Sequence, residues 1–398
     1  MRILQINSVC GVGSTGRIAT DLYKVLEEQG HECLIAYGRG TAPEGINSYK
    51  IGTNLDNYLH VVRTRLLDQH GYGSKKPTIE LVKKIKEYNP DVIHLHNLHG
   101  YYLNLEVLFD YLEESNKPVI WTLHDCWAFT GHCAYFDYIG CDKWKNGCSN
   151  CPQIKSYPSS YFFDNSNNNF EFKKRLFTKL KNLTIITPSN WLLIEVKKSF
   201  LSKYNCEVIN NGIDLEIFQP RNSEFRKRYN LEGKKIILGV ANIWDKRKGL
   251  DSFIQLSSKI NENYQIILVG ITEKQRIQLP QNIISIPRTS NAMELAEIYT
   301  VADVFINPTL EDNFPTVNLE AVACGTPVIS FDTGGSSETI IDGYGEIVLQ
   351  KNIDSIINIL ENSNFYSRDL DCLQEKVKMN LSNQVKFNQY INLYNRCK

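Results

Sequence analysis

Short apolar runs alternate with helix-periodic segments along most of this 398-residue chain, and this alternation restricts its fold more than any other feature. The apolar runs fall into two series, which comprise residues 2–7, 33–37, 92–96, 119–123, 184–187 and 208–210, and then residues 236–240, 265–269, 283–286, 304–306 and 328–330. Strands that alternate with helices form parallel sheets covered by helices on both faces. The sequence therefore predicts an α/β protein with two doubly wound, Rossmann-like domains.

Turn-forming residues mark the junction between the two series. Asn210, Asn211 and Gly212 end the last strand of the first series, and residues of these types favour turns. We predict a first domain over residues 1–213 and a second domain over residues 214–372.

Two further segments differ from this pattern. Residues 373–398 carry apolar residues at helical spacing, which predicts a terminal helix. Residues 156–172 are polar and aromatic without a core-forming period, which predicts a mobile loop.

The charge and the apolar content exclude several classes of protein. The 44 basic residues (Lys and Arg) balance 44 acidic ones, so the chain lacks the positive excess of a nucleic-acid-binding protein. It has no run of about 18 apolar residues, and residues 1–7 have the pattern of a strand and not of a signal peptide. We therefore expect a cytoplasmic protein. In such a protein the 11 cysteines are thiols or metal ligands.

A strand, an acidic loop and a short helix follow one another between residues 304 and 329. Pro315 stands at a first-turn position of the helix, and Gly325 and Pro327 end it. The free amides of a first helical turn, together with the helix dipole, form a site for an anion such as a diphosphate. Asp312 and Glu320 flank this turn, and carboxylates accept hydrogen bonds from vicinal hydroxyls. The segment therefore predicts a site for a sugar and a ribose on either side of a diphosphate.

This segment resembles the signature of the retaining nucleotide-sugar glycosyltransferases of family 4, whose GT-B fold has two Rossmann-like domains facing a central cleft. The family has two glutamates separated by seven residues; here Asp312 takes the first position, with Glu311 as a neighbouring substitute, and Glu320 takes the second. The resemblance implies catalytic roles for Asp312 and Glu320, with Glu320 also at the nucleotide ribose. It implies further donor-binding positions at Asn313, Phe314, Pro315, Thr316 and Val317. It also implies that the terminal helix at 373–398 packs back on the first domain.

Basic residues follow the first strand of the second series. Arg247 and Lys248 precede Gly249, and cations at the carboxyl end of a strand neutralise the charge on a departing nucleoside diphosphate. The resembled family has a Lys-Gly pair here, with its Arg several residues earlier. The resemblance therefore implies a catalytic, donor-binding Lys248 assisted by Arg247. It also implies that catalysis requires no cofactor, because cationic side chains and helix dipoles replace a metal.

The glycines at 11, 13 and 16 follow the first strand and formally match the dinucleotide-binding fingerprint. That fingerprint needs an acidic residue at the end of the second strand, and residues 34–39 contain none, although Arg39 would suit a 2′-phosphate. An NADP-dependent oxidoreductase therefore stays an alternative. In the resembled family the corresponding loop approaches the donor phosphate or the acceptor, which implies donor-binding roles for Gly13 and Gly16.

Another strand of the first series ends in His124 and Asp125, at the sheet edge where doubly wound proteins bind ligands. The resembled family has a histidine here near the donor sugar, which implies a catalytic role for His124. We expect Asp125, Trp127 and His96 to contact the acceptor. Asp125 is also a candidate general base if the reaction inverts the anomeric configuration.

Cysteines are concentrated between residues 126 and 152. Cys133, Cys141, Cys148 and Cys151 are candidate ligands of a structural zinc, because four thiolates close a tetrahedral site and Cys148-x2-Cys151 has the short-loop spacing. Cys126, His124 and His132 are replacement ligands, and free reduced thiols are the alternative. The run from His124 to Cys133, His-Asp-Cys-Trp-Ala-Phe-Thr-Gly-His-Cys, is similar to a subgroup of bacterial polysaccharide glycosyltransferases of the colanic acid and capsule type that carry a Cys-rich insertion.

The resemblance implies transfer of a hexose from a UDP- or GDP-type sugar, with retention, to a lipid-linked saccharide. Such an acceptor belongs to a bacterial capsule, exopolysaccharide or O-antigen and is met at the inner face of the cell membrane. Basic residues at 173–175 and 197–198 are candidates for peripheral contact with anionic lipid. A GT-B sugar-nucleotide epimerase and a catalytically silent saccharide-binding protein remain as further alternatives.

Overall fold

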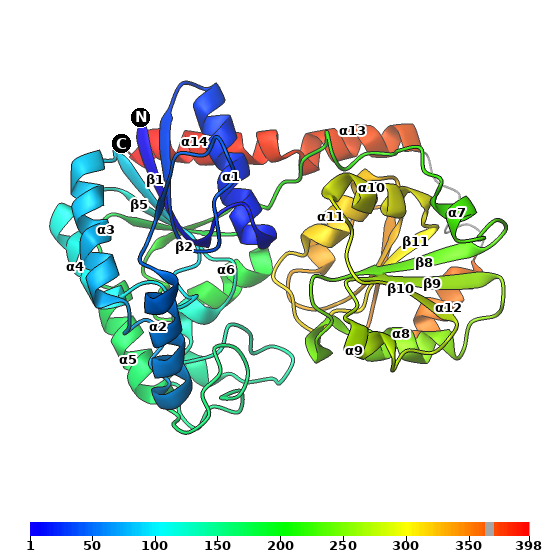
Figure 1. Cartoon of the computed structure of the whole chain (residues 1–398), viewed down its shortest axis with the longest axis horizontal. Helices are drawn as coiled ribbons and strands as arrows, with labels where there is room; N and C mark the ends of the chain where they lie inside the picture. Colours follow the sequence, from blue (N-terminus) through cyan, green and yellow to red (C-terminus); the bar gives the residue numbers. More distant parts are fainter. Residues whose placement is uncertain (363–369, 398) are drawn as a thin grey trace. The chain divides into compact units, whose positions relative to one another are not determined.

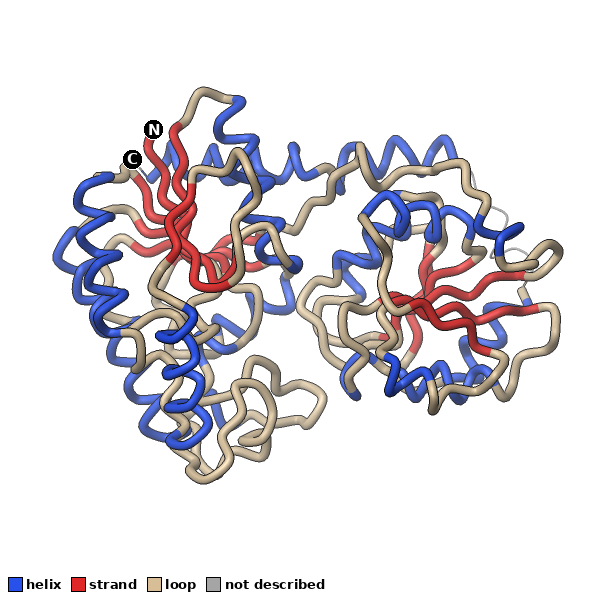
Figure 2. Tube along the Cα trace, viewed as in Figure 1, coloured by secondary structure: helices blue, strands red, loops and turns tan. Residues whose placement is uncertain are grey.

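The computed structural model describes residues 1–362 and 370–397. The chain forms two compact units, Met1–Asn210 with Phe387–Lys398 and Asn211–Lys386. In each unit the strands gather into one parallel sheet with helices on the outside (Figures 1 and 2). Two Rossmann-like, doubly wound units are what the alternation of strands and helices predicts, and this prediction is confirmed.

The first sheet has the strand order β3-β2-β1-β4-β5-β6-β7 within the described residues. The strands are β1 (Arg2–Val9), β2 (Glu32–Arg39), β3 (Ser48–Lys50), β4 (Val92–Leu95), β5 (Val119–Thr122), β6 (Leu183–Thr187) and β7 (Asn205–Val208). The helices are α1 (Gly13–Glu28), α2 (Asn54–Leu67), α3 (Lys75–Tyr88), α4 (Leu105–Ser115), η1 (Trp127–Phe129), η2 (Lys143–Lys145), α5 (Ser166–Phe177) and α6 (Asn190–Lys197). The order of the strands along the chain reverses between β1 and β4, which is where doubly wound sheets bind ligands.

The second sheet has the order β10-β9-β8-β11-β12-β13 over the part of the chain that is described. The strands are β8 (Lys235–Val240), β9 (Tyr264–Val269), β10 (Ile283–Ile286), β11 (Val304–Asn307), β12 (Val328–Phe331) and β13 (Gly345–Val348). The helices are α7 (Phe225–Arg228), η3 (Lys246–Lys248), α8 (Leu250–Ser257), α9 (Glu273–Arg276), α10 (Ala292–Val301), α11 (Thr316–Ala323), η4 (Ser337–Thr339), α12 (Ile353–Glu361) and α13 (Leu370–Leu381). Here the order reverses between β8 and β11.

Successive residues of a strand point to opposite faces of its sheet, so the first unit has a core on each face. In β1, Leu4 and Ile6 belong to one core, and Ile3 belongs to the other. Because both faces are buried, the strands read as continuous apolar runs and not as alternating ones.

The C-terminal segment is divided between the two units. In α13, Leu373 and Val377 lie in the core of the second unit, whereas Phe387 and Tyr390 of α14 (Asn383–Cys397) lie in a core of the first. The prediction that residues 373–398 form one helix on the first domain is therefore wrong for the first half of this segment. Apolar spacing predicts a helix but does not show which core its apolar face contacts.

The junction itself packs against the break between these two helices. The amide of Ile213 donates to the carbonyl of Leu381, and the amide of Asn383 donates to the carbonyl of Ile213, at 2.8 and 2.9 Å. A Cβ at Gly212 would lie 2.4 Å from the Cα of Asn383. Glycine is therefore required at position 212.

The segment at 156–172 is more ordered than the sequence predicts. Helix α5 begins at Ser166, so the prediction of a mobile loop is wrong for the end of this segment. Before the helix, the amide of Tyr161 donates to the carbonyl of Arg65 at 2.8 Å, and the amide of Asn165 donates to Asp68 Oδ2 at 2.9 Å. These partners lie about 100 residues earlier in the chain, which is why local periodicity does not reveal them.

Helix α14 is fixed to the first sheet by buried polar contacts as well as by its apolar face. Tyr394 Oη lies 2.7 Å from His94 Nδ1, and His94 Nε2 lies 2.8 Å from Thr122 Oγ1. Burial lowers the pKa of His94 to about 3, so the imidazole is neutral at physiological pH. A neutral imidazole has one donor and one acceptor nitrogen, and both are used here.

We predict that Tyr394→Phe destabilises the first unit by about 1–3 kcal/mol, because the substitution leaves a buried nitrogen of His94 without a partner. The loss is measured as a shift of the urea unfolding midpoint. Tyr58→Phe is the matched control, since Tyr58 is 65% exposed on the same unit. Equal midpoints for the two variants would show that the buried contact makes no net contribution to the free energy of unfolding.

Candidate active site

In the second unit, the predicted donor residues meet at the carboxyl ends of β8 and β11. Helix η3 carries Arg247 and Lys248 shortly after β8, and residues 308–315 connect β11 to α11. β8 and β11 are neighbours in a parallel sheet, so the segments that follow them lie at the same edge. The basic turn and the acidic loop are thereby brought together, as their positions after strands predict.

An ion pair joins these two segments. Lys248 Nζ lies 2.6 Å from Asp312 Oδ2, and Arg247 Nη1 donates to the carbonyl of Glu311 at 2.8 Å. Burial by itself would raise the pKa of Asp312. The nearby cations Lys248 and Arg247 lower it by more, so the pKa lies below its usual value. Asp312 is therefore an ionised, oriented hydrogen-bond acceptor at neutral pH.

Local features of the sequence set the geometry of this pair. Asp245 caps η3, because its Oδ1 accepts the amide of Lys248 at 3.0 Å. Gly249 has a φ of +78°, and a Cβ there would lie 2.1 Å from the carbonyl oxygen of Pro308. The glycine after Lys248 thus permits the close approach of the two segments.

Helix α11 begins directly after the acidic loop, with Pro315 as its N-cap residue. Two buried amides hold this helix on the sheet: Asn307 Nδ2 donates to Asn318 Oδ1, and Asn318 Nδ2 donates to Thr339 Oγ1, both at 2.8 Å. The amides of Thr316 and Val317 lie in the first turn, where the helix dipole favours an anion. Phe314 anchors the loop in the core, and Asn313 is also buried.

The second predicted acid, Glu320, lies inside the unit. Its side chain belongs to α11, is 3% exposed, and accepts a hydrogen bond at 3.2 Å from the hydroxyl of Tyr299.

In the first unit, the predicted histidines form a chain at the edge of the sheet. His96 Nε2 lies 3.0 Å from Gln5 Oε1, and His96 Nδ1 lies 3.1 Å from His124 Nε2. Burial lowers the pKa of His124 to about 4, although Asp125 raises it, and burial also holds the pKa of His96 well below its usual value. Because Gln5 Oε1 can only accept, His96 donates from Nε2 and accepts at Nδ1 from His124. Nδ1 of His124 is then the acceptor nitrogen of a neutral ring.

Asp125 is held by a residue that the sequence analysis missed. His99 Nε2 lies 2.7 Å from Asp125 Oδ2, and His99 Nδ1 lies 2.8 Å from Tyr157 Oη, while Asp125 Oδ1 accepts the amide of Trp127 at 2.9 Å. Burial raises the pKa of Asp125, but His99 outweighs this, and the carboxylate stays ionised. His96, His99, His124, Asp125 and Trp127 line one pocket, so the three predicted acceptor residues are brought together. A signal was available, because His99 comes soon after a strand that ends at this edge.

The glycines of the first turn have different roles. Gly11 has a φ of +71°, and a Cβ there would lie 2.4 Å from Cγ of Pro43; the amide of Gly11 donates to the carbonyl of Gly16 at 3.0 Å. Gly13 has a φ of +67° with no heavy atom within 4 Å of its Cβ position. The bond between Gly11 and Gly16 closes the turn, and the donor-binding roles of Gly13 and Gly16 stay predictions.

The four predicted zinc ligands, Cys133, Cys141, Cys148 and Cys151, line one pocket. Within residues 1–362 and 370–397, no three or more His, Cys, Asp or Glu side chains are arranged to hold a metal ion. The thiols of Cys133 and Cys151 are hydrogen-bonded, and this bond lowers the pKa of Cys151 to about 7. The zinc site at these four cysteines stays a prediction.

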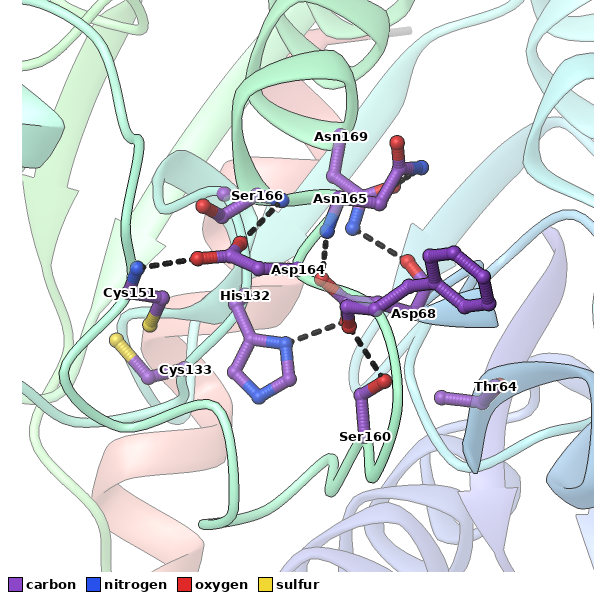
Figure 3. A network of polar contacts seen from close by, with 12 residues as sticks. Thr64, Asp68, His132, Cys133, Cys151, Ser160, Asp164, Asn165, Ser166 and Asn169 are labelled. Carbon is purple, nitrogen blue, oxygen red and sulfur yellow. Dashed lines mark hydrogen bonds and ion pairs between the residues drawn. The ribbon is translucent and has the colours of Figure 1, made fainter. Parts of the chain in front are cut away.

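A buried network supports this Cys-rich segment (Figure 3). His132 Nδ1 lies 2.5 Å from Asp68 Oδ1, and both side chains are almost fully buried. Asp164 accepts the amides of Cys151 and Ser166 at 2.5 and 2.9 Å. The network ties the segment to the C-terminal end of α2 and to α5.

Two doubly wound Rossmann-like units are the architecture of the GT-B fold. The family model described as "Glycosyltransferase Family 4" matches residues 15–217, and the one described as "Glycosyl transferases group 1" matches residues 221–364. The chain belongs to glycosyltransferase family 4, as the signature at Asp312 and Glu320 predicts.

Three known proteins illustrate the similarity. WcaC of Escherichia coli K12, named as a colanic acid biosynthesis glycosyl transferase, is 25% identical over 99% of both chains. The N,N'-diacetylbacillosaminyl-diphospho-undecaprenol alpha-1,3-N-acetylgalactosaminyltransferase of Campylobacter jejuni is 24% identical over 44% of this chain and 47% of its own. The structure of Anabaena Alr3699/HepE in complex with UDP-glucose has a TM-score of 0.68 at 14% identity and covers both chains fully, which shows the same fold.

We predict that Lys248→Ala lowers the rate of sugar transfer by about a hundredfold or more, because a cation beside the leaving diphosphate stabilises charge in the transition state. The rate is measured as nucleoside diphosphate released with acceptor present. Lys246→Ala is the control, since Lys246 is exposed on the same turn. A Lys248→Ala variant that folds normally and is as fast as the control would remove Lys248 from the chemistry.

The zinc prediction is tested by metal analysis of protein purified without chelators. Four thiolates bind zinc tightly, so about one zinc per chain is expected, and Cys148→Ser should lower that content. Cys206→Ser is the control, because Cys206 lies on β7, outside the pocket. Metal-free wild-type protein would establish the alternative of reduced thiols.

Proposed function

We propose that this glycosyltransferase moves a hexose from a UDP- or GDP-type sugar, with retention of configuration, to a lipid-linked saccharide in bacterial capsule, exopolysaccharide or O-antigen synthesis. The observation that carries the proposal is the Lys248–Asp312 ion pair, which immediately precedes the N-terminus of α11. Support for the donor class comes from the fold shared with a protein that binds UDP-glucose. Support for the acceptor class comes from relatives named for colanic acid synthesis and for a diphospho-undecaprenol substrate.

The donor residues act on the leaving group. Lys248, Arg247 and the first-turn amides of α11 neutralise the β-phosphate, whose negative charge increases as the glycosidic bond breaks. Asp312, held in place by Lys248, accepts a hydrogen bond from a hydroxyl of the donor sugar. Glu320 binds the ribose. Cationic side chains supply the charge for this step, so the proposal includes no catalytic metal.

The acceptor residues position the attacking hydroxyl. His124 is neutral and presents Nδ1 as an acceptor, and Asp125 is ionised beside it. In the retaining reaction the hydroxyl attacks from the side of the leaving group, and the departing phosphate accepts its proton. His99 has both ring nitrogens engaged, so it positions Asp125 and does not itself take the proton. An inverting reaction with Asp125 as base is distinguished by the anomer of the product, as seen by NMR.

The proposed location is the cytoplasm, in peripheral contact with the inner face of the cell membrane. Among the described residues, none of the helices has the length and apolar composition needed to span a bilayer. A lipid-linked acceptor then requires the protein to meet the membrane at its surface.

We predict that Glu320→Gln weakens nucleotide binding, because the uncharged amide accepts ribose hydroxyls more weakly than a carboxylate does. Binding is measured by thermal shift with UDP, GDP and their sugars. Glu346→Gln is the control, since Glu346 is exposed on β13 of the same unit. Undiminished binding in Glu320→Gln would contradict the assignment of the ribose site.

Product analysis separates this function from the alternatives. A transferase releases nucleoside diphosphate only when an acceptor is present. An epimerase converts the nucleotide sugar without any acceptor, an NADP-dependent oxidoreductase oxidises or reduces a substrate with the dinucleotide, and a silent saccharide-binding protein consumes no donor.

A further inference from the structure

Helix α2 of the first unit buries its polar side and exposes its apolar side. The side that faces the protein carries Asn57, His60 and Thr64, all buried. The side that faces solvent carries large apolar residues with exposed fractions of 65% for Leu55, 65% for Tyr58, 56% for Leu59 and 43% for Leu66. A surface helix normally buries its apolar side, so this helix presents to solvent the face that usually packs in a core.

Hydrogen bonds of the buried polar side chains fix the orientation of α2, with its polar side toward the protein. Asn57 Nδ2 donates to the carbonyl of Gly38 at 2.9 Å, and His60 Nε2 accepts the amide of Gly71 at 3.1 Å. His60 Nδ1 also lies 2.9 Å from Ser74 Oγ. Turning the apolar side inward would break these bonds, so the exposure of the apolar side is a built feature of the fold.

The apolar residues form a continuous stripe with a positive border. At about 100° per residue, Leu55, Tyr58, Leu59, Val62 and Leu66 fall within an arc of about 100° on the helix surface. Arg63 and Arg65 are exposed just beyond the two edges of this arc. The acidic residue of the helix, Asp56, is engaged at its N-terminus, where it accepts hydrogen bonds from Thr53 in a capping box.

The segment that precedes α5 lies beside the C-terminal end of α2. Phe162 and Phe163 are 73% and 60% exposed in the segment that precedes α5. This segment is fixed to α2, because the amide of Tyr161 donates to the carbonyl of Arg65 and the Arg65 guanidinium lies 5.8 Å from the centre of the Tyr161 ring.

We propose that the docking face, defined as Leu55, Tyr58, Leu59, Val62, Leu66, Phe162 and Phe163, inserts into the headgroup region of a membrane that contains anionic lipid. An exposed apolar stripe with arginines along both edges is the pattern of a helix that lies in a membrane interface, where apolar groups enter the acyl boundary and cations meet lipid phosphates. The choice of a membrane as the occupant rests on this charge complementarity and on the proposed lipid-linked acceptor.

The basic segments expected from the sequence to contact lipid do not form this surface. Lys173 is buried, and its Nζ donates to the carbonyls of Trp127 and Thr130 at 2.7 and 2.9 Å. Lys198 pairs with Glu195 at 2.7 Å, and Arg175 pairs with Glu106 at 3.1 Å. Lys174 and Lys197 are exposed, so the contact of these segments with lipid stays a prediction.

The test is flotation of the full chain with vesicles of phosphatidylcholine, with and without about one third phosphatidylglycerol. The wild type is expected to float with the anionic vesicles, and the double variant Phe162→Ser/Phe163→Ser to lose binding by about tenfold or more. The double variant Arg63→Gln/Arg65→Gln is expected to lose the preference for anionic lipid. Ile277→Ser/Met293→Ser is the matched control, because these side chains are 78% and 52% exposed on the second unit.

Several outcomes would overturn the proposal. These are wild-type protein that stays with the soluble fraction, serine variants that float as the wild type does, and a control that loses binding equally. Self-association of the wild type, detected by light scattering and abolished by Phe162→Ser/Phe163→Ser, would show that the face belongs to a second copy instead.

The vesicle assay contains neither donor nor acceptor, so its result is independent of sugar transfer. Protein that floats with anionic vesicles but neither binds nucleotides nor transfers sugar would retain the docking face and overturn the proposed function. Protein that binds nucleotides but does not float with the vesicles would overturn the docking proposal and leave the proposed function standing.

Discussion

The Lys248–Asp312 ion pair depends on one constraint, the parallel arrangement of β8 and β11 in the second sheet. Parallel neighbours bring the segments that follow them to a common edge, so residues 64 positions apart meet at 2.6 Å. Gly249 permits the close approach, and the amides of Asn307 and Asn318 hold α11 against the strand. The proposed anion site therefore depends on the backbone geometry of the sheet as well as on the charged side chains.

At the corresponding edge of the first sheet, the side chains are fixed by hydrogen bonds between buried histidines. Its histidines are kept neutral by burial and linked through defined donors and acceptors, from Gln5 through His96 to His124. Asp125 alone among the predicted acceptor residues stays ionised, because His99 compensates for its burial. A neutral acceptor nitrogen beside a carboxylate is suited to binding hydroxyl groups without trapping a proton.

Much of the fold could be predicted from the sequence, and so could the grouping of the candidate donor residues at one edge of the second sheet. Strand ends, Pro315 and Gly249 are local signals for this edge, but the ion pair between Lys248 and Asp312 was not predicted. Contacts with distant partners could not be predicted in this way. The pairing of His99 with Asp125 and the burial of Lys173 against carbonyls depend on tertiary packing, and so does the division of the terminal segment between two cores.

We infer that the second unit binds the diphosphate of a nucleotide sugar at Lys248 and the first turn of α11. A crystal structure of the protein soaked with UDP or GDP tests this inference. The β-phosphate is expected within hydrogen-bond distance of Lys248 Nζ and the amide of Thr316 or Val317, with the ribose against Glu320. A nucleotide bound elsewhere, with this edge of the second sheet closed by side chains, would contradict it.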